Sequence, residues 1–176
     1  MIARKVNAGI SLLTTCLIFI HAISIAVWML SFGTIGRLPA ILSWMLVACV
    51  LFHAFISIDM VVSGLMSDEP RKGKMYPKLN RATIVQRVSG FLMIVLAGLH
   101  VAGTVGPMQP PRIIHGIVPP LFFAIVMAHV AISTSKAFIT LGIGNVKFLK
   151  RADIAIKALC VATLAADVVG FYLYVF

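Results

Sequence analysis

Charged residues are scarce in this chain. Asp, Glu, Lys and Arg together make up 11% of its 176 residues, whereas hydrophobic residues make up 61%. In soluble domains about a quarter of the residues are charged, so this composition excludes an ordinary soluble fold. We therefore predict a protein that lies in a lipid bilayer.

The sequence also lacks the motifs of common redox and nucleotide sites. Its three cysteines lie singly in apolar stretches, without the C-x-x-C spacing typical of an iron–sulfur site: Cys16, Cys49 and Cys160. No glycine-rich phosphate loop follows a strand, so nothing indicates a nucleotide or flavin site. Iron–sulfur and flavin chemistry are therefore not expected in this chain.

Long apolar stretches are what the sequence has in abundance, and there are five: residues 8–32, 40–66, 84–106, 112–138 and 153–175. Each is long enough to cross a hydrocarbon core of about 30 Å at a helical rise of about 1.5 Å per residue. Strands are excluded because an open sheet leaves backbone groups unpaired in lipid, whereas a helix satisfies its own. The sequence therefore predicts one all-α membrane domain over residues 1–176 with five transmembrane helices.

Prolines and polar residues mark the predicted connections. Residues 67–81 and 140–152 are polar, and we expect two loops there, with Pro77 among the residues that break the helix. Pro119 and Pro120 fall inside the fourth apolar stretch, where they predict a kink. Both polar loops would lie on one side of the membrane, and each is long enough to contact a partner protein.

The basic residues are distributed unevenly between the ends of the predicted helices. Of fifteen Lys and Arg residues, all but Arg37 and Arg112 would lie on one side of the membrane. Basic residues favour the cytoplasmic side. Four aromatic residues fall at the opposite helix ends, where an outer aromatic belt is expected: Trp28, Trp44, Tyr172 and Tyr174. The pattern predicts a cytoplasmic N-terminus and an outer C-terminus in a bacterial or archaeal cell membrane. The membrane topology and the attraction of basic loops to anionic lipid headgroups also explain the formal charge of +10, so nucleic acid is not expected as a partner.

Four histidines lie inside the first four apolar stretches, one in each: His21, His53, His100 and His129. An ionisable residue within a membrane helix is costly and is a functional candidate. A single such histidine could equally be a packing group bonded to a neighbouring helix, but four in four helices favour a shared role. Two facing imidazoles occupy both axial positions of haem iron and fit it for electron transfer rather than oxygen binding.

The depths of these histidines sort them into two pairs. Counted from the outer helix ends, His100 and His21 lie about 9 and 16 Å deep, and His53 and His129 about 20 and 26 Å deep. An outer pair and an inner pair predict two stacked b-type haems, which would conduct electrons across the bilayer.

Residues 83–90 open the third apolar stretch with the sequence TIVQRVSG. This resembles the S-x-x-x-R-x-S-G signature of the cytochrome b membrane anchors of succinate dehydrogenases and fumarate reductases, with Thr83 in place of the first serine. The whole chain resembles the single-subunit, five-helix, dihaem form of that family. There, helices 1 to 4 form a haem-binding bundle with a fifth helix beside it. Helix 1 pairs with helix 3 and helix 2 with helix 4, which implies the axial pairs His21/His100 and His53/His129.

The resemblance implies an electron-transfer subunit of a succinate:quinone oxidoreductase, without catalytic residues of its own. A flavoprotein and an iron–sulfur protein, both separate chains on the cytoplasmic face, would interconvert succinate and fumarate. This chain would carry electrons between their clusters and a membrane quinone, menaquinone or ubiquinone, through two haem b groups. The direction of the reaction and a higher oligomer of the complex stay open.

Four further polar residues are candidates for the quinone and for protons. Thr83, Arg87 and Ser89 could hold a quinone carbonyl or a haem propionate; alternatively, Arg87 extends to the membrane surface. Asp167 lies deep in the fifth stretch without a charged neighbour in sequence. A buried carboxylate there must be protonated or paired, and a proton route is one use for it.

Two other functions stay open at this point. The first is a haem b quinone-reactive subunit of another respiratory enzyme, such as a hydrogenase or a formate dehydrogenase, against which the TIVQRVSG motif argues. The second is a haem-free transporter or assembly protein in which the histidines pack helices or transfer protons.

Overall fold

The computed structural model describes residues 2–31, 38–66, 77–105 and 112–175. These residues form five helices: α1 (Ile2–Leu30), α2 (Leu38–Met66), α3 (Pro77–Val105), α4 (Arg112–Leu141) and α5 (Val146–Val175). Each helix contains a segment long and apolar enough to cross a membrane. The prediction of an all-α protein with five helices of membrane-spanning length is confirmed.

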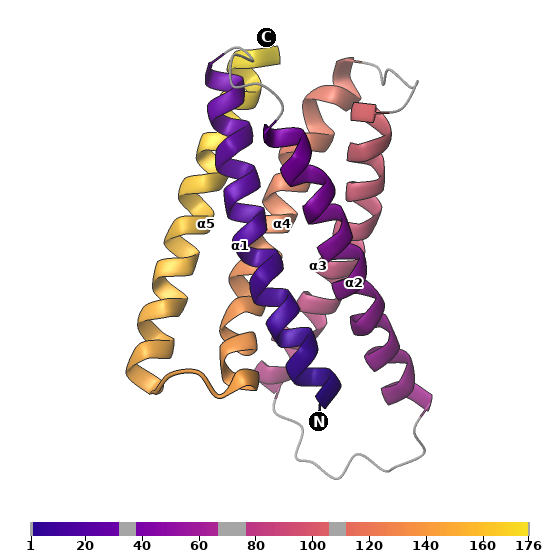
Figure 1. The fold of residues 1–176 in the computed structure, drawn as a ribbon, viewed down its shortest axis with the longest axis vertical. Coiled ribbons are helices and arrows are strands. Elements are labelled where there is room, and N and C mark those ends of the chain that lie inside the picture. The colour runs from indigo at the N-terminus through magenta and orange to yellow at the C-terminus, as the bar shows by residue number, and fades with distance from the viewer. Residues whose placement is uncertain (1, 32–37, 67–76, 106–111, 176) are drawn as a thin grey trace.

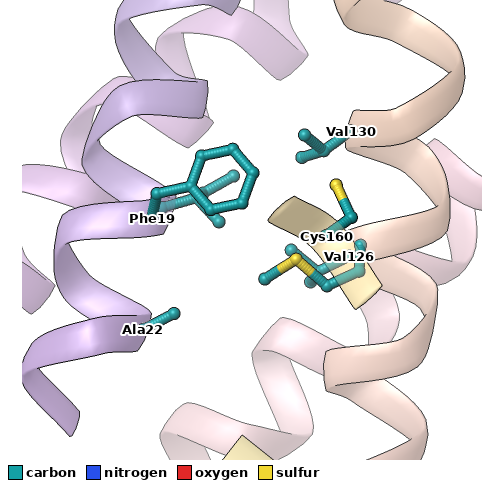
Figure 2. Packing of buried hydrophobic residues seen from close by; sticks show 7 residues of the cluster. Phe19, Ala22, Val126, Val130 and Cys160 are labelled. Carbon is teal, nitrogen blue, oxygen red and sulfur yellow. The ribbon is translucent and has the colours of Figure 1, made fainter. Parts of the chain in front are cut away.

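The helices stand side by side and run alternately in opposite directions, so the two termini lie at opposite ends of the bundle (Figure 1). α1, α4 and α5 pack against one another. Their facing side chains form a hydrophobic core, much of which is shown in Figure 2: Ile18, Phe19 and Ala22 of α1, Val126, Met127 and Val130 of α4, and Cys160 of α5. α5 therefore does not stand beside a four-helix bundle as expected, because it supplies part of the central core.

α2 and α3 lie at the periphery. α2 packs against α1, and α3 packs against α4, but the described parts of α2 and α3 make hardly any contact with each other. Among the described side chains, none of α2 and only Ser89 of α3 is buried. The molecule thus consists of a central group of three helices, with α2 packed along α1 and α3 packed along α4.

Three helices begin earlier than predicted: α1 at Ile2 rather than residue 8, α3 at Pro77 rather than 84, and α5 at Val146 rather than 153. Hydropathy marks the segment that suits lipid, whereas the backbone of a helix continues its hydrogen bonds into the polar region beyond it. Pro77 begins a helix instead of ending one, because the first helical position needs no N–H donor. The predicted loop 67–81 is correspondingly shorter, and its residues 67–76 lie outside the described part of the chain.

The predicted loop 140–152 is in fact a tight turn between α4 and α5. Gly142 adopts a φ of 72°, and its N–H donates to the Ile139 carbonyl at 3.1 Å while the Ile143 N–H donates to the Phe138 carbonyl at 3.0 Å. This pair of bonds is a Schellman motif, which favours glycine. Asn145 then caps α5, since its Oδ1 accepts from the Phe148 N–H at 2.9 Å.

α4 continues without interruption through Pro119 and Pro120. Proline has no N–H, so Pro120 cannot donate to the carbonyl of Gly116 one turn earlier. The Tyr172 hydroxyl of α5 donates to that carbonyl at 3.2 Å instead. A side chain of the neighbouring helix thus replaces the missing bond, as is needed where water is excluded.

The two ends of the bundle differ in composition. The basic residues whose side chains are described lie in the helix segments nearer the N-terminal end of the molecule (Figure 1): Arg4, Lys5, Arg81, Arg87, Lys136, Lys147, Lys150, Arg151 and Lys157. Arg112 begins α4 at the other end, as predicted. At the other end the rings of Trp28 and Tyr174 lie 5.1 Å apart, centroid to centroid. The distribution is the one predicted, and which end faces the cytoplasm stays a prediction.

Candidate functional site

The four histidines project from four different helices and are all half-buried: His21 from α1, His53 from α2, His100 from α3 and His129 from α4. His21 and His100 lie close enough to interact electrostatically. The same is true of His53 and His129. In each pair one imidazole comes from the α1–α2 hairpin and the other from the α3–α4 hairpin. These are the pairs expected from depth, and their binding to iron stays a prediction.

The pair His21 and His100 lies in an apolar and aromatic environment. The His100 ring stacks on Phe122 of α4 with centroids 5.2 Å apart and an interplanar angle of 27°, and Phe123 lies at 6.4 Å from it. The Nδ1 atom of His21 is buried and has no hydrogen-bond partner among the described residues. A buried unpaired nitrogen is unfavourable, so the Nδ1 of His21 needs a partner that the described residues do not supply.

The pair His53 and His129 is more polar. His129 Nδ1 lies 2.9 Å from Ser89 Oγ, and that hydroxyl also lies 3.1 Å from the backbone carbonyl of Gln86. A carbonyl can only accept, so the Ser89 hydroxyl gives its single proton to Gln86 and accepts from the Nδ1–H of His129. This leaves the lone pair of His129 on Nε2. His53 Nδ1 is buried and has no partner within the described chain, while the ring of this histidine interacts with the backbone of Asn7 on α1.

Gly90 allows His129 to lie directly against α3. A Cβ atom at this position would come within 3.3 Å of His129 Cε1, closer than ordinary packing permits. Ser89 and Gly90, the last two residues of TIVQRVSG, therefore position the histidine of the neighbouring helix. Sequence reasoning missed this role for Ser89; its signal was the serine–glycine pair next to each other in a helix.

The structure does not bring the other motif residues to the same place. Ser89 is buried against His129, whereas Arg87 is exposed and Thr83 is half-buried. The three side chains therefore do not line one enclosed pocket. Lys136 of α4 extends to α3, where its Nζ donates to Gln86 Oε1 at 2.8 Å.

Asp167 lies apart from this polar cluster, on the core face of α5. Its side chain is only 1% exposed, and neither carboxyl oxygen has a hydrogen-bond partner among the described residues. One turn further along, a Cβ at Gly170 would lie 3.4 Å from the Met29 side chain of α1, so the two helices are closely packed here. The predicted proton route through Asp167 has neither support nor contradiction in these contacts.

The arrangement of donors was tested against the cofactor that the sequence implies. No three His, Cys, Asp or Glu side chains in the described chain gather closely enough to hold a metal ion by themselves. Haem iron needs only two axial side chains, because the porphyrin supplies the other ligands. Paired imidazoles and a His129 tautomer with its lone pair on Nε2 fit that requirement. The Nδ1 atoms of His21 and His53 lack, among the described residues, the acceptor that a ligating imidazole usually has.

The interior volume is the feature that fits less well. A cavity of about 20 Å³ lies between α1, α2, α3 and α4 and is lined by both His53 and His129. This volume suits a single water molecule rather than a porphyrin. A haem would therefore not fit this cavity unless the helices around it moved apart.

No protein-family model, curated protein or solved structure matches this chain. Over the described residues, the fold and the site define an all-helical chain with five helices of membrane-spanning length and two pairs of histidines close enough to interact electrostatically.

Proposed function

We propose that this chain is the dihaem cytochrome b membrane anchor of a succinate dehydrogenase or fumarate reductase complex. In that role it carries electrons between a cytoplasmic iron–sulfur subunit and a membrane quinone. The observation that carries the proposal is the placement of one histidine from each of α1 to α4 in two close pairs across the hairpins. A pair of imidazoles saturates haem iron, which restricts it to electron transfer.

Each residue has a definite task in this proposal. His21 and His100 hold one haem, and His53 and His129 hold the other. Each haem supplies a site that gains and loses one electron. Ser89 accepts the Nδ1–H of His129 and so keeps Nε2 available for the iron. Phe122 limits the tilt of the His100 ring by stacking on it. Asp167 is the candidate for a proton route in α5.

The positively charged end of the bundle supports the location of the partners. The basic segments of α1, α3 and α5 lie together there, and basic residues favour the cytoplasmic side of a membrane. An iron–sulfur subunit bound at this end would lie nearer to the haem of His53 and His129 than to the other haem. That haem is therefore proposed to exchange electrons with the cluster first.

The decisive experiment is the haem content of the purified chain. Expression in haem-replete cells, purification in mild detergent and a pyridine haemochrome assay should give about two haem b per polypeptide. A colourless, folded preparation would contradict the proposal and favour a haem-free transporter or assembly protein. Co-purification of the native partners then separates a succinate dehydrogenase or fumarate reductase from other respiratory complexes.

A further inference from the structure

A groove with a volume of about 280 Å³ opens on the outer surface of the bundle between α3 and α4. Its walls are almost entirely apolar and include Ile84, Val88 and Leu92 of α3 and Ile125 and Ala128 of α4. Several of these side chains are exposed rather than packed on another helix; Ile84, for example, is 58% exposed. Because both helices are of membrane-spanning length, the groove would face the acyl chains of a bilayer.

The sequence positions of two cationic residues, Arg81 on α3 and Lys136 on α4, place them toward one end of this groove. Arg81 precedes Ile84 and Val88 at the spacings i+3 and i+7, which places all three on one face of α3. Lys136 follows Ala128 by about two turns of α4 and lies at the seam with α3, where it contacts Gln86. Arg81 is exposed and Lys136 is half-buried.

We propose that this groove binds one anionic phospholipid, with an acyl chain between α3 and α4 and the phosphate beside Arg81 and Lys136. An ammonium group has three protons, so Lys136 keeps two for a phosphate after donating one to Gln86. Basic sites at the ends of membrane helices attract anionic headgroups. A quinone headgroup is neutral and would gain little from two cations, so the charge favours a phospholipid.

Native mass spectrometry of the full chain in non-ionic detergent tests the charge requirement. Phosphatidylglycerol should bind in a one-to-one complex, more tightly than phosphatidylcholine of the same chain length. Arg81→Gln and Lys136→Gln should each weaken that complex about fivefold, the contribution of one basic residue near a membrane surface. The glutamine at position 136 can still donate to Gln86. Lys150→Gln is the control. It removes an exposed charge of α5 at the same end of the bundle and should leave binding unchanged.

A steric variant tests the location of the acyl chain. Ala128→Phe should place a ring in the groove and weaken phosphatidylglycerol binding with both cations intact, whereas Ala162→Phe on the exposed face of α5 should not. Circular dichroism checks that each variant keeps its helix content. If Ala128→Phe loses helix content, the smaller substitution Ala128→Leu replaces it in the same measurement.

Three results would overturn the proposal. The first is equal affinity for the two lipids. The second is an affinity for phosphatidylglycerol that is unchanged in Arg81→Gln, Lys136→Gln and Ala128→Phe. The third is displacement of the phospholipid by a quinone whose affinity falls in Ala128→Phe but not in Lys136→Gln. That result would make the groove a quinone site. None of these measurements uses haem, so their outcome is independent of the proposed electron transfer.

Discussion

At the scale of single residues, Ser89 and His129 show how one hydroxyl determines the state of a neighbouring ring. The Ser89 hydroxyl donates to a carbonyl of its own helix, and it can therefore only accept from His129. The bond orients the imidazole and assigns its proton to Nδ1. In metal sites such a second partner of a ligating histidine sharpens both the ring orientation and the affinity for the metal.

If the chain binds two haems as proposed, replacing Ser89 by alanine should affect one of them only. Without its acceptor, the His129 ring loses its preferred orientation, and the inner haem should be bound more weakly, by about tenfold or more. The reduced-minus-oxidised spectrum and a redox titration should show a change in one component while the other keeps its midpoint potential. Ser133→Ala is the matched control, since that hydroxyl bonds to the backbone carbonyl of His129 rather than to its ring. Equal loss of both components would contradict this assignment.

The pairing of histidines makes a second prediction at this scale. An alanine in place of one axial imidazole leaves the iron without a ligand, so that haem should be lost or become five-coordinate. His53→Ala and His129→Ala should remove the same spectral component, and His21→Ala and His100→Ala the other. Redox titration of the four variants, each checked for insertion in the membrane, measures this. Loss of one common component from His53→Ala and His100→Ala would show that the pairing is wrong.

At the scale of helices, α4 and α5 depend on each other at the proline pair. The Tyr172 hydroxyl donates to the Gly116 carbonyl, which Pro120 leaves without its usual helical donor. The bond joins the two helices near the end opposite the N-terminus, where α5 also packs against α1 through Gly170. The carbonyl of α4 that lacks its helical donor thus forms a hydrogen bond with α5, and this bond helps to fix the position of α5 against α4.

Tyr172→Phe should accordingly destabilise the chain by about 1 kcal/mol, the usual contribution of one hydrogen bond. Thermal unfolding in detergent, followed by circular dichroism, should show a lower midpoint for this variant. Tyr174→Phe provides the control, because the neighbouring Trp28 contacts its ring and a phenylalanine keeps that ring. An unchanged midpoint in Tyr172→Phe would mean that the Gly116 carbonyl finds another donor.

At the scale of the whole molecule, the two ends of the bundle differ in composition. Most basic residues with described side chains lie at the end of the N-terminus, and Trp28 and Tyr174 lie at the other end. The centre of the bundle is formed by α1, α4 and α5, whereas α2 and α3 are attached from one side each.

The charged end makes a prediction about partners. Lys147 is exposed at the start of α5, so amine-reactive crosslinkers applied to native membranes should join it to a cytoplasmic iron–sulfur subunit. Mass spectrometry of the crosslinked peptides identifies the partner, and a Lys147→Gln variant gives the background. Lys74, in the predicted connection between α2 and α3, should react in the same way, although it lies outside the described residues. Crosslinks to proteins of the outer face alone would reverse the predicted topology.

The sequence by itself determined the number of helices and the separation of charge along them. Both properties are sums over local residues: about twenty apolar residues suffice for a membrane span, and basic residues collect where water is available. The count of one histidine in each of four helices is likewise visible without a structure.

Only the tertiary structure decided which faces of the helices meet. In lipid, an outer apolar face is as favourable as an inner one, so hydropathy does not indicate how each helix is rotated. The contact of Ser89 with His129, the bond from Tyr172 to Gly116 and the place of α5 in the core all follow from that rotation. They depend on the packing of small residues and on hydrogen bonds between distant segments, which no local pattern encodes.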